Sequence, residues 1–294
     1  DFEPFTDKFR AVIEPLARIK SRQKQGKVEK TPVEGTSDTS TGQTTLTGQI
    51  NALYIVLNEA KFLKASIDAV IKRPEVGKVV VVEGADRRYP SANKMGLSTD
   101  KTAEKMRYLT KKYGEKIVWE RYGWADKGKE ELRQRAIDLA QAQPGQWMLF
   151  VDGDEVWEDI NWQVLMENLQ KFSKNDSFSP GVVYFKHHHF WHDKEKVAVG
   201  GQWNSNLFRL FRMTDEKPHI NFHGGEPCDV NGISWGKKYG MHTLSDVFVH
   251  HYGYCKDEKD VQDKIIPGQN GSLECQRSQH TGVVHLRNIP ASIR

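Results

Sequence analysis

The first half of the chain alternates short apolar runs with segments whose apolar residues recur at helical spacing. The apolar runs predict buried strands at Leu53–Leu57, Lys78–Val82, Ile117–Trp119 and Met148–Val151. Between them, helical spacing predicts one helix that starts near Leu63 and ends before Pro74, one over Lys105–Tyr113, and one from Leu132 to Ala140. Such alternation predicts an α/β fold with a mainly parallel central sheet and helices on both faces, connected by right-handed crossovers.

The pattern changes beyond Trp157. Apolar and aromatic runs predict strands at Val182–Trp191 and Leu207–Met213, and no long helix is predicted until after Asp257. We expect this part to form a smaller antiparallel region that builds the wall opposite the crevice of the parallel sheet.

Composition changes mark the predicted boundaries. Residues 1–49 are expected to form a short N-terminal helix, interrupted by Pro15, and then a flexible arm, because Gln25–Gln49 is polar and rich in Gly, Ser and Thr. Residues 50–266 form the main domain, divided into halves at 50–157 and 158–266. Residues 267–294 form a tail with weak periodicity.

The overall composition is that of an ordinary soluble protein. The 294 residues are 37% hydrophobic and 28% charged, which is enough to bury a full core. A net charge of +4 and a pI near 8.8 suit an anionic substrate or peripheral contact with a membrane, and the scattered basic residues give no indication of nucleic acid binding. No apolar run approaches the roughly 20 residues of a transmembrane helix and no signal-peptide pattern is present, so we expect a cytoplasmic location. The three cysteines are widely spaced, so neither a disulfide framework nor a CxxC metal site is indicated.

The most informative segment is Val151-Asp-Gly-Asp-Glu155, directly after the strand over Met148–Val151. Gly153 allows a sharp turn, so the carboxylates of Asp152, Asp154 and Glu155 are expected to converge beyond the strand end. Ligands of open α/β sheets bind at the carboxyl ends of the strands, and hard divalent cations prefer oxygen ligands. The segment therefore predicts a metal that holds a phosphorylated substrate. The alternative is a solvated turn whose aspartates cap the next helix.

Several segments together resemble the inverting family-two glycosyltransferases of the GT-A fold, in a bacterial and viral subset. The resemblance covers residues 50–266 and is carried by the acidic segment and four others: Tyr54–Leu63, Val79–Gly84, Leu132–Ala140 and Phe248–Tyr254. It implies transfer of a sugar from a nucleotide diphosphate donor to a hydroxyl of a glycan or lipid-linked saccharide, with Mn²⁺ or Mg²⁺ as cofactor.

The resemblance also implies roles for individual residues. Leu57, Asn58 and Glu59 would line the nucleoside pocket, and Glu83 would read the base, which favours UDP-sugars although aspartate is commoner there. Asp152 would face the ribose and the metal, Asp154 would bind the metal, and Arg133 or Arg135 would meet the diphosphate. The third metal ligand is expected to be His250, with His251 and His223 as alternatives. Glu226 is expected to be the general base, with Asp193 and Asp229 as alternatives.

Other interpretations stay open. His187, His188, His189 and His192 form a cluster that could bind zinc, although no cysteine or second histidine pair accompanies it. Trp191 and Trp203 suit either sugar stacking or core packing. A nucleotidyltransferase is the nearest chemical rival, but Asn58-Glu-Ala-Lys61 supplies no glycine-rich phosphate loop. A degenerate scaffold domain that binds sugar nucleotides is the rival from another class.

Overall fold

The computed structural model describes residues 46–87, 92–174, 179–191, 194–198, 206–221 and 225–255, and the backbone of a short strand at Val283–His285. The predicted N-terminal helix, the arm up to residue 45, nearly all of the tail, and the residues His192, Asp193, Trp203 and His223 lie outside these residues. The compact unit Thr44–Val284 contains the elements discussed below. Among the described residues, no helix has the length and apolar character needed to cross a bilayer.

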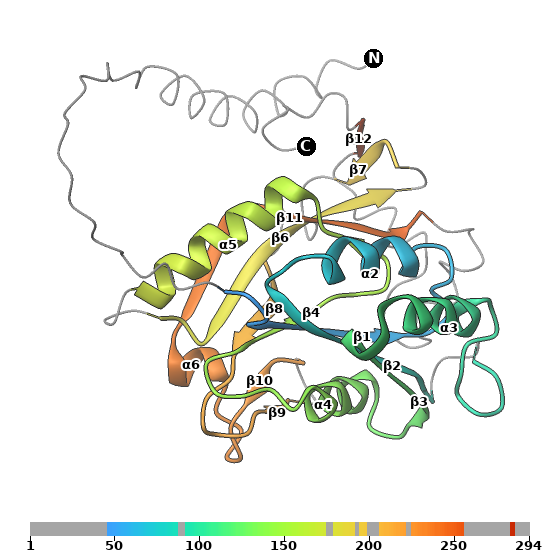
Figure 1. The fold of residues 1–294 in the computed structure, drawn as a ribbon, viewed down its shortest axis with the longest axis horizontal. Helices are drawn as coiled ribbons and strands as arrows, with labels where there is room; N and C mark the ends of the chain where they lie inside the picture. Colours follow the sequence, from blue (N-terminus) through green and yellow to red (C-terminus); the bar gives the residue numbers. More distant parts are fainter. Residues whose placement is uncertain are drawn as a thin grey trace. The chain divides into compact units, whose positions relative to one another are not determined.

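The first half of the unit is built as predicted, from strands alternating with helices (Figure 1). Its elements are β1 (Ile50–Val56), α2 (Leu63–Ile71), β2 (Val76–Asp86), α3 (Thr102–Tyr113), η1 (Gly114–Lys116), β3 (Ile117–Ala125), α4 (Lys129–Ala140) and β4 (Trp147–Phe150). Strand β1 pairs in parallel with both β2 and β4, and β2 pairs in parallel with β3. The predicted mixed α/β fold with a mainly parallel central sheet is confirmed.

The second half extends the same sheet. Its elements are β5 (Glu155–Val156), α5 (Asp159–Lys174), β6 (Val182–Trp191), β7 (Lys196–Ala198), β8 (Leu207–Arg212), β9 (His219–Ile220), β10 (Pro227–Cys228), α6 (Trp235–Tyr239), β11 (Met241–Tyr254) and β12 (Val283–His285). Strand β8 pairs antiparallel with both β4 and β6, while β11 pairs in parallel with β6 and antiparallel with β5. The main path through the sheet runs β12-β7-β6-β8-β4-β1-β2-β3.

The expectation of no long helix between Trp157 and Asp257 is wrong, because α5 spans Asp159–Lys174. Its buried residues Trp162, Leu165, Leu169 and Phe172 recur at helical spacing. They pack into the core on one face of the sheet, so α5 covers the antiparallel half of the sheet as α2 covers the parallel half.

The two faces of the sheet are covered by different helices. Along β1, Ala52, Tyr54 and Val56 point into the core that α2, α3 and α5 share, while Leu53 points into the core under α4 and α6. This alternation follows from the period of two in a strand. Because both faces are covered, ligands have access at the ends of the strands.

Candidate active site

The acidic segment forms the turn between β4 and β5, at the carboxyl end of the buried strand β4. The Val151 N–H donates to the Leu53 carbonyl at 2.9 Å, so the chain runs beside β1 up to the start of the turn. The side chain of Asp152 is 34% exposed, whereas those of Asp154 and Glu155 are 3% and 1% exposed. The carboxylates therefore lie at different depths, and Asp152 is the one that a ligand reaches from solvent.

Arg209, which the sequence analysis did not single out, forms ion pairs with two carboxylates of the acidic turn, those of Asp152 and Glu155. Its Nη2 lies 2.7 Å from Asp152 Oδ2 and 2.6 Å from Glu155 Oε1, and Glu155 Oε1 also lies 2.9 Å from His187 Nε2. Burial raises the pKa of Glu155, and the Arg209 guanidinium opposes this rise. Burial would also raise the pKa of Asp152, but Arg209 and then Arg133 outweigh it and hold that pKa at about 2. Asp152 is thus ionised at neutral pH.

Strand β11 places two adjacent histidines on opposite faces. His251 Nε2 lies 3.5 Å from Asp154 Oδ1, whereas His250 Nδ1 lies 3.4 Å from Glu158 Oε1. A Cβ atom at Gly253 would lie 3.1 Å from Asp154 Oδ2 and 2.8 Å from His251 Nε2, so the glycine permits this close approach. The structure brings His251 to the acidic turn and places His250, whose pKa burial lowers to about 4, beside Glu158 instead.

The loop after β1 is joined to the acidic turn by direct packing. Asn58 has a φ of +54°, and its Oδ1 accepts a hydrogen bond from the Thr99 N–H at 2.8 Å. Glu59 lies against Gly153, where a Cβ atom would approach Glu59 Cγ to 2.9 Å. Gly153 does not have a positive φ, so the requirement for glycine there comes from this contact and not from the backbone turn that the sequence suggested.

Glu83 is fully buried inside β2 and is held by two partners. Its Oε1 accepts from the Ser98 N–H at 3.1 Å, and its Oε2 lies 3.2 Å from Arg121 Nε. Ser98 Oγ in turn accepts from the Asn58 N–H at 3.1 Å. Glu83 thereby fixes the loop over residues 92–100 beside the end of β1, and its direct contact with a base stays a prediction.

The arginines on α4 differ in their surroundings. Arg135 pairs with Glu120 at 2.9 Å. The Arg133 guanidinium instead lies over the Phe150 ring at 5.3 Å and against Gly225, where any side chain would collide with it. Burial lowers the pKa of Arg133, and the charge of Asp152 opposes this shift. Within the described ranges, no carboxylate forms an ion pair with Arg133, so its charge faces the acidic site unneutralised by direct contact.

Glu226 follows Gly225, so it lies in the segment that contacts Arg133. Its Oε1 accepts a hydrogen bond from the Tyr184 hydroxyl at 2.6 Å. Burial and the Glu226 carboxylate raise the pKa of Tyr184, so this hydroxyl keeps its proton. Asp229, the alternative base, is buried and accepts from the Asn231 and Ile233 N–H groups at 2.9 Å, which is the role of a turn residue.

The residues of the acidic turn fit a divalent cation only if a ligand completes the site. Among the described residues, no group of three or more His, Cys, Asp or Glu side chains is arranged to hold a metal ion. Asp152, Asp154 and His251 nevertheless offer ligand atoms of the types that Mn²⁺ and Mg²⁺ accept. A magnesium-type site uses one or two carboxylates and leaves its other positions to phosphates and water. The donor set therefore suits a cation shared with a diphosphate.

The described histidines of the cluster, His187, His188 and His189, are divided between the two faces of β6, and Trp191 packs in the core. His187 and His189 stack on one face of β6 with ring centroids 5.7 Å apart, while His188 stacks on Phe248 at 4.5 Å. This division between faces disfavours a zinc site made of neighbouring histidines. Trp191 is buried and lies 5.0 Å from Tyr254, as expected for core packing.

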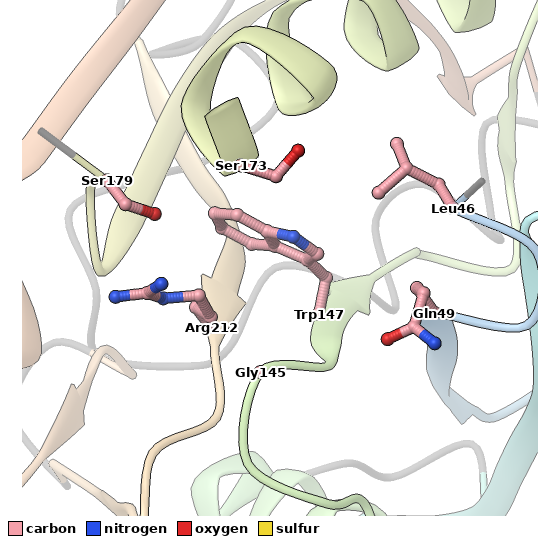
Figure 2. A pocket seen from close by; sticks show the side chains of 7 residues that line it. All are labelled: Leu46, Gln49, Gly145, Trp147, Ser173, Ser179 and Arg212. Atoms are coloured by element: carbon pink, nitrogen blue, oxygen red, sulfur yellow. The ribbon is translucent and has the colours of Figure 1, made fainter. Parts of the chain in front are cut away.

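A separate cavity of about 290 Å³ lies at the other end of the sheet, where β1 and β4 begin (Figure 2). It is lined by Leu46, Gln49, Gly145, Trp147, Ser173, Ser179 and Arg212. Ligands of open α/β sheets bind at the carboxyl ends of the strands, and the acidic turn lies there. We therefore assign the chemistry to the acidic turn and not to this cavity.

Comparison with known proteins gives matches of structure. Neither a protein-family model nor a curated protein matches the sequence. The chain is similar to S. aureus TarS, with a TM-score of 0.44 and 13% identity over 69% of this chain and 36% of that one. It is similar to glucosyl-3-phosphoglycerate synthase from Mycobacterium tuberculosis in complex with Mn²⁺, UDP and glucosyl-3-phosphoglycerate, with a TM-score of 0.42 and 13% identity over 79% of this chain and 75% of that one.

A further match is 4-diphosphocytidyl-2C-methyl-D-erythritol synthase from Anaerococcus prevotii, with a TM-score of 0.38 and 10% identity over 73% of this chain and 93% of that one. The chain spans about a third of the TarS chain that it matches. The matched proteins are GT-A glycosyltransferases and a nucleotidyltransferase, and with TM-scores below 0.5 these matches assign no family to this chain. They concern the fold, and the activity has to be argued from the residues of the site.

Proposed function

We propose that the chain is a metal-dependent inverting glycosyltransferase that transfers a sugar from a nucleotide diphosphate donor to a hydroxyl of a glycan or lipid-linked saccharide. One observation carries the proposal: the acidic turn and the Asn58–Glu59 loop meet where the strand order reverses. The chain runs from β1 to β2 and β3 in one direction and then returns to place β4 on the other side of β1. The crevice at such a switch point is where α/β sheets bind nucleotides.

The charges around this crevice suit a diphosphate. Arg133 lies over the Phe150 ring and against Gly225, and no carboxylate of the described residues forms an ion pair with it, so its guanidinium is available to a phosphate oxygen. Asp154 lies deeper, beside His251. Mn²⁺ or Mg²⁺, when bound by Asp154, Asp152 and His251, would offset the charge that grows on the departing diphosphate. Arg209 keeps Asp152 ionised and oriented for this role.

We propose that Glu226 is the general base that acts on the acceptor hydroxyl. In an inverting transfer, the acceptor oxygen forms a bond to the anomeric carbon while the bond from that carbon to the diphosphate oxygen breaks. The nucleoside diphosphate leaves with the electron pair, and a base takes the acceptor proton. Glu226 is a half-buried carboxylate that the Tyr184 hydroxyl orients, and it lies next to the segment that contacts Arg133.

The donor is proposed to be a UDP-sugar. Glu83 holds Ser98 and, through it, Asn58, so it shapes the wall beside the end of β1 where the nucleoside would lie. A carboxylate in this wall can accept hydrogen bonds from a base edge. Because Glu83 is fully buried, binding of the base would require movement of the loop over residues 92–100.

The alternative function, a nucleotidyltransferase, would need a glycine-rich, basic phosphate loop after β1, and the Asn58–Lys61 segment does not supply one. The lysine that follows the β1 loop, Lys61, donates from Nζ to the Cys255 carbonyl at 2.7 Å and is therefore engaged elsewhere. Such an enzyme would release pyrophosphate from a nucleoside triphosphate. A glycosyltransferase would release a nucleoside diphosphate from a sugar nucleotide.

The proposal is tested by incubating the protein with UDP-, GDP- and dTDP-sugars and Mn²⁺ and measuring nucleoside diphosphate release with and without candidate acceptors. We expect Mn²⁺-dependent release of UDP that Asp154→Asn lowers by at least about 100-fold, since it removes a charged group that acts in the transition state. Asp159→Asn is the matched control, because Asp159 is 93% exposed and pairs with Arg73, away from the acidic turn. Release of pyrophosphate from nucleoside triphosphates, or no release from any sugar nucleotide, would refute the proposal.

A further inference from the structure

His189, on β6, contacts His251 from the neighbouring strand. The Cα atoms of the two residues are register partners in the parallel β6–β11 pair. Their Nδ1 atoms lie 3.2 Å apart, and their rings meet edge to face with centroids 4.9 Å apart. This is hydrogen-bond distance, so one Nδ1 carries the proton and the other accepts it.

The hydrogen bond fixes which way the His251 ring faces. Since Nδ1 of His251 points to His189, its Nε2 points to Asp154 at 3.5 Å. Gly253 closes the other side, because a Cβ atom there would lie 2.8 Å from Nε2. The ring is therefore held between β6 and the glycine of its own strand.

The contact allows either ring to be the donor, and the two cases differ in the tautomer of His251. If His251 donates from Nδ1 to His189, the neutral His251 ring keeps a lone pair on Nε2, on the side of Asp154. Metal-binding histidines commonly donate their other ring N–H to a neighbouring acceptor, which orients the ring and raises its basicity.

We propose that His189 is a positioning residue that holds His251 with its Nε2 lone pair directed at the cation site beside Asp154. This inference rests on the proposed function, since it assumes that His251 binds the cation. His187, two residues away on the same face, is not placed to orient His251, because its register partner on β11 is Val249 and its Nε2 lies 2.9 Å from Glu155 Oε1.

The test is Mn²⁺ binding in the presence of UDP, measured by calorimetry on the wild type and on His189→Leu and His189→Asn. We expect His189→Leu to raise the apparent Kd for Mn²⁺ by about tenfold or more, the usual effect of losing such a partner. His189→Asn places an amide near the position of Nδ1 and is expected to restore the affinity to within about threefold of the wild type. His188→Asn is the matched control, because His188 faces the opposite side of β6 and stacks on Phe248.

A second comparison separates positioning from packing. In a His251→Ala background, His189→Leu should not weaken Mn²⁺ binding further, since the two residues act through one contact. An unchanged Kd in His189→Leu, equal weakness of the Asn and Leu variants, or additive losses in the double variant would overturn the inference. Failure of the proposed metal role would appear separately, as absence of Mn²⁺ binding by the wild type.

Discussion

We propose Glu226 as the base that takes the proton from the acceptor hydroxyl. The Tyr184 hydroxyl donates to it at 2.6 Å, and this contact fixes the direction of the carboxylate. We expect Glu226→Gln to lower kcat for UDP release by about 10²–10⁴, the usual contribution of a general base, without changing nucleotide affinity. Steady-state kinetics together with UDP titrations check both parts.

Glu216 provides the matched control for Glu226→Gln. Glu216 pairs with Lys238 at 2.7 Å, so Glu216→Gln should leave kcat close to the wild-type value. If Glu226→Gln kept wild-type turnover, the base would have to be sought elsewhere, with Asp193 the remaining alternative from the sequence.

The absence of a side chain at Gly153 lets the acidic turn pack closely against the loop after β1. A methyl group there would approach Glu59 Cγ to 2.9 Å and the Val56 side chain to 3.5 Å. We expect Gly153→Ala to lower the free energy of unfolding by about 1–3 kcal/mol, as overpacking does, and to weaken nucleotide binding by pushing apart the β1 loop and the acidic turn. Urea denaturation and UDP titration measure the two effects, and a variant as stable as the wild type would contradict the contact.

At the scale of elements, Asp68 joins α2 to α3. It forms ion pairs with Lys64 on its own helix at 2.6 Å and with Lys112 on α3 at 3.1 Å, and it also accepts from the Tyr113 hydroxyl. Burial would raise the pKa of Asp68, but the hydrogen bonds from Lys64, Tyr113 and Lys112 outweigh it and hold the pKa at about 2, below the usual 3.8.

Because the folded-state pKa is depressed, the stabilisation by Asp68 is fully present above the unfolded pKa and is lost as pH falls from about 4 through about 2. We expect Asp68→Asn to cost about 1–2 kcal/mol near neutral pH, after allowance for the partly exposed lysines. The difference in unfolding free energy between variant and wild type should shrink as the pH is lowered. Urea denaturation at several pH values measures it, and a difference that does not change with pH would contradict this account.

The sequence predicted those strands and helices whose own residues show a recognisable pattern of apolar positions. The strands of the parallel half showed β-branched runs, and α2 and α4 showed helical spacing between a strand and a proline. Helix α5 was not predicted although Trp162, Leu165 and Phe172 have the same spacing, because the aromatic runs beyond Trp157 favour strands.

The position of the acidic segment after a buried strand was enough to predict the acidic turn. The two residues that contact this turn, Arg209 and His251, do not follow from any local pattern. Arg209 arrives on β8, which is antiparallel to β4, and His251 arrives on β11, which pairs with both β5 and β6. These contacts join residues far apart in sequence, so no local pattern encodes them. Adjacent residues of a strand point to opposite faces, so either His250 or His251 faces the acidic turn. Which one does so depends on the register of β11, and the sequence alternation alone does not fix that register.

For the whole molecule, the strand order decides where the chemistry lies. With β4 returning to the far side of β1, the carboxyl ends of these strands bring Asn58, Glu59, Asp152 and Asp154 to one edge. The helices cover both faces, as Figure 1 shows, so this edge is the natural opening for a nucleotide. The central claim is therefore that the acidic turn binds a nucleoside diphosphate together with a divalent cation.

Thermal unfolding with UDP, with and without Mn²⁺, tests that claim most directly, because a ligand that binds only the folded state raises Tm. At about 100 times Kd the stabilisation is about 2.7 kcal/mol, or roughly 5 °C or more for a domain of this size. We predict that UDP with Mn²⁺ raises Tm by about this amount in the wild type and much less in Asp154→Asn. An equal rise in both proteins, or no rise with any nucleoside diphosphate and Mn²⁺, would contradict the account.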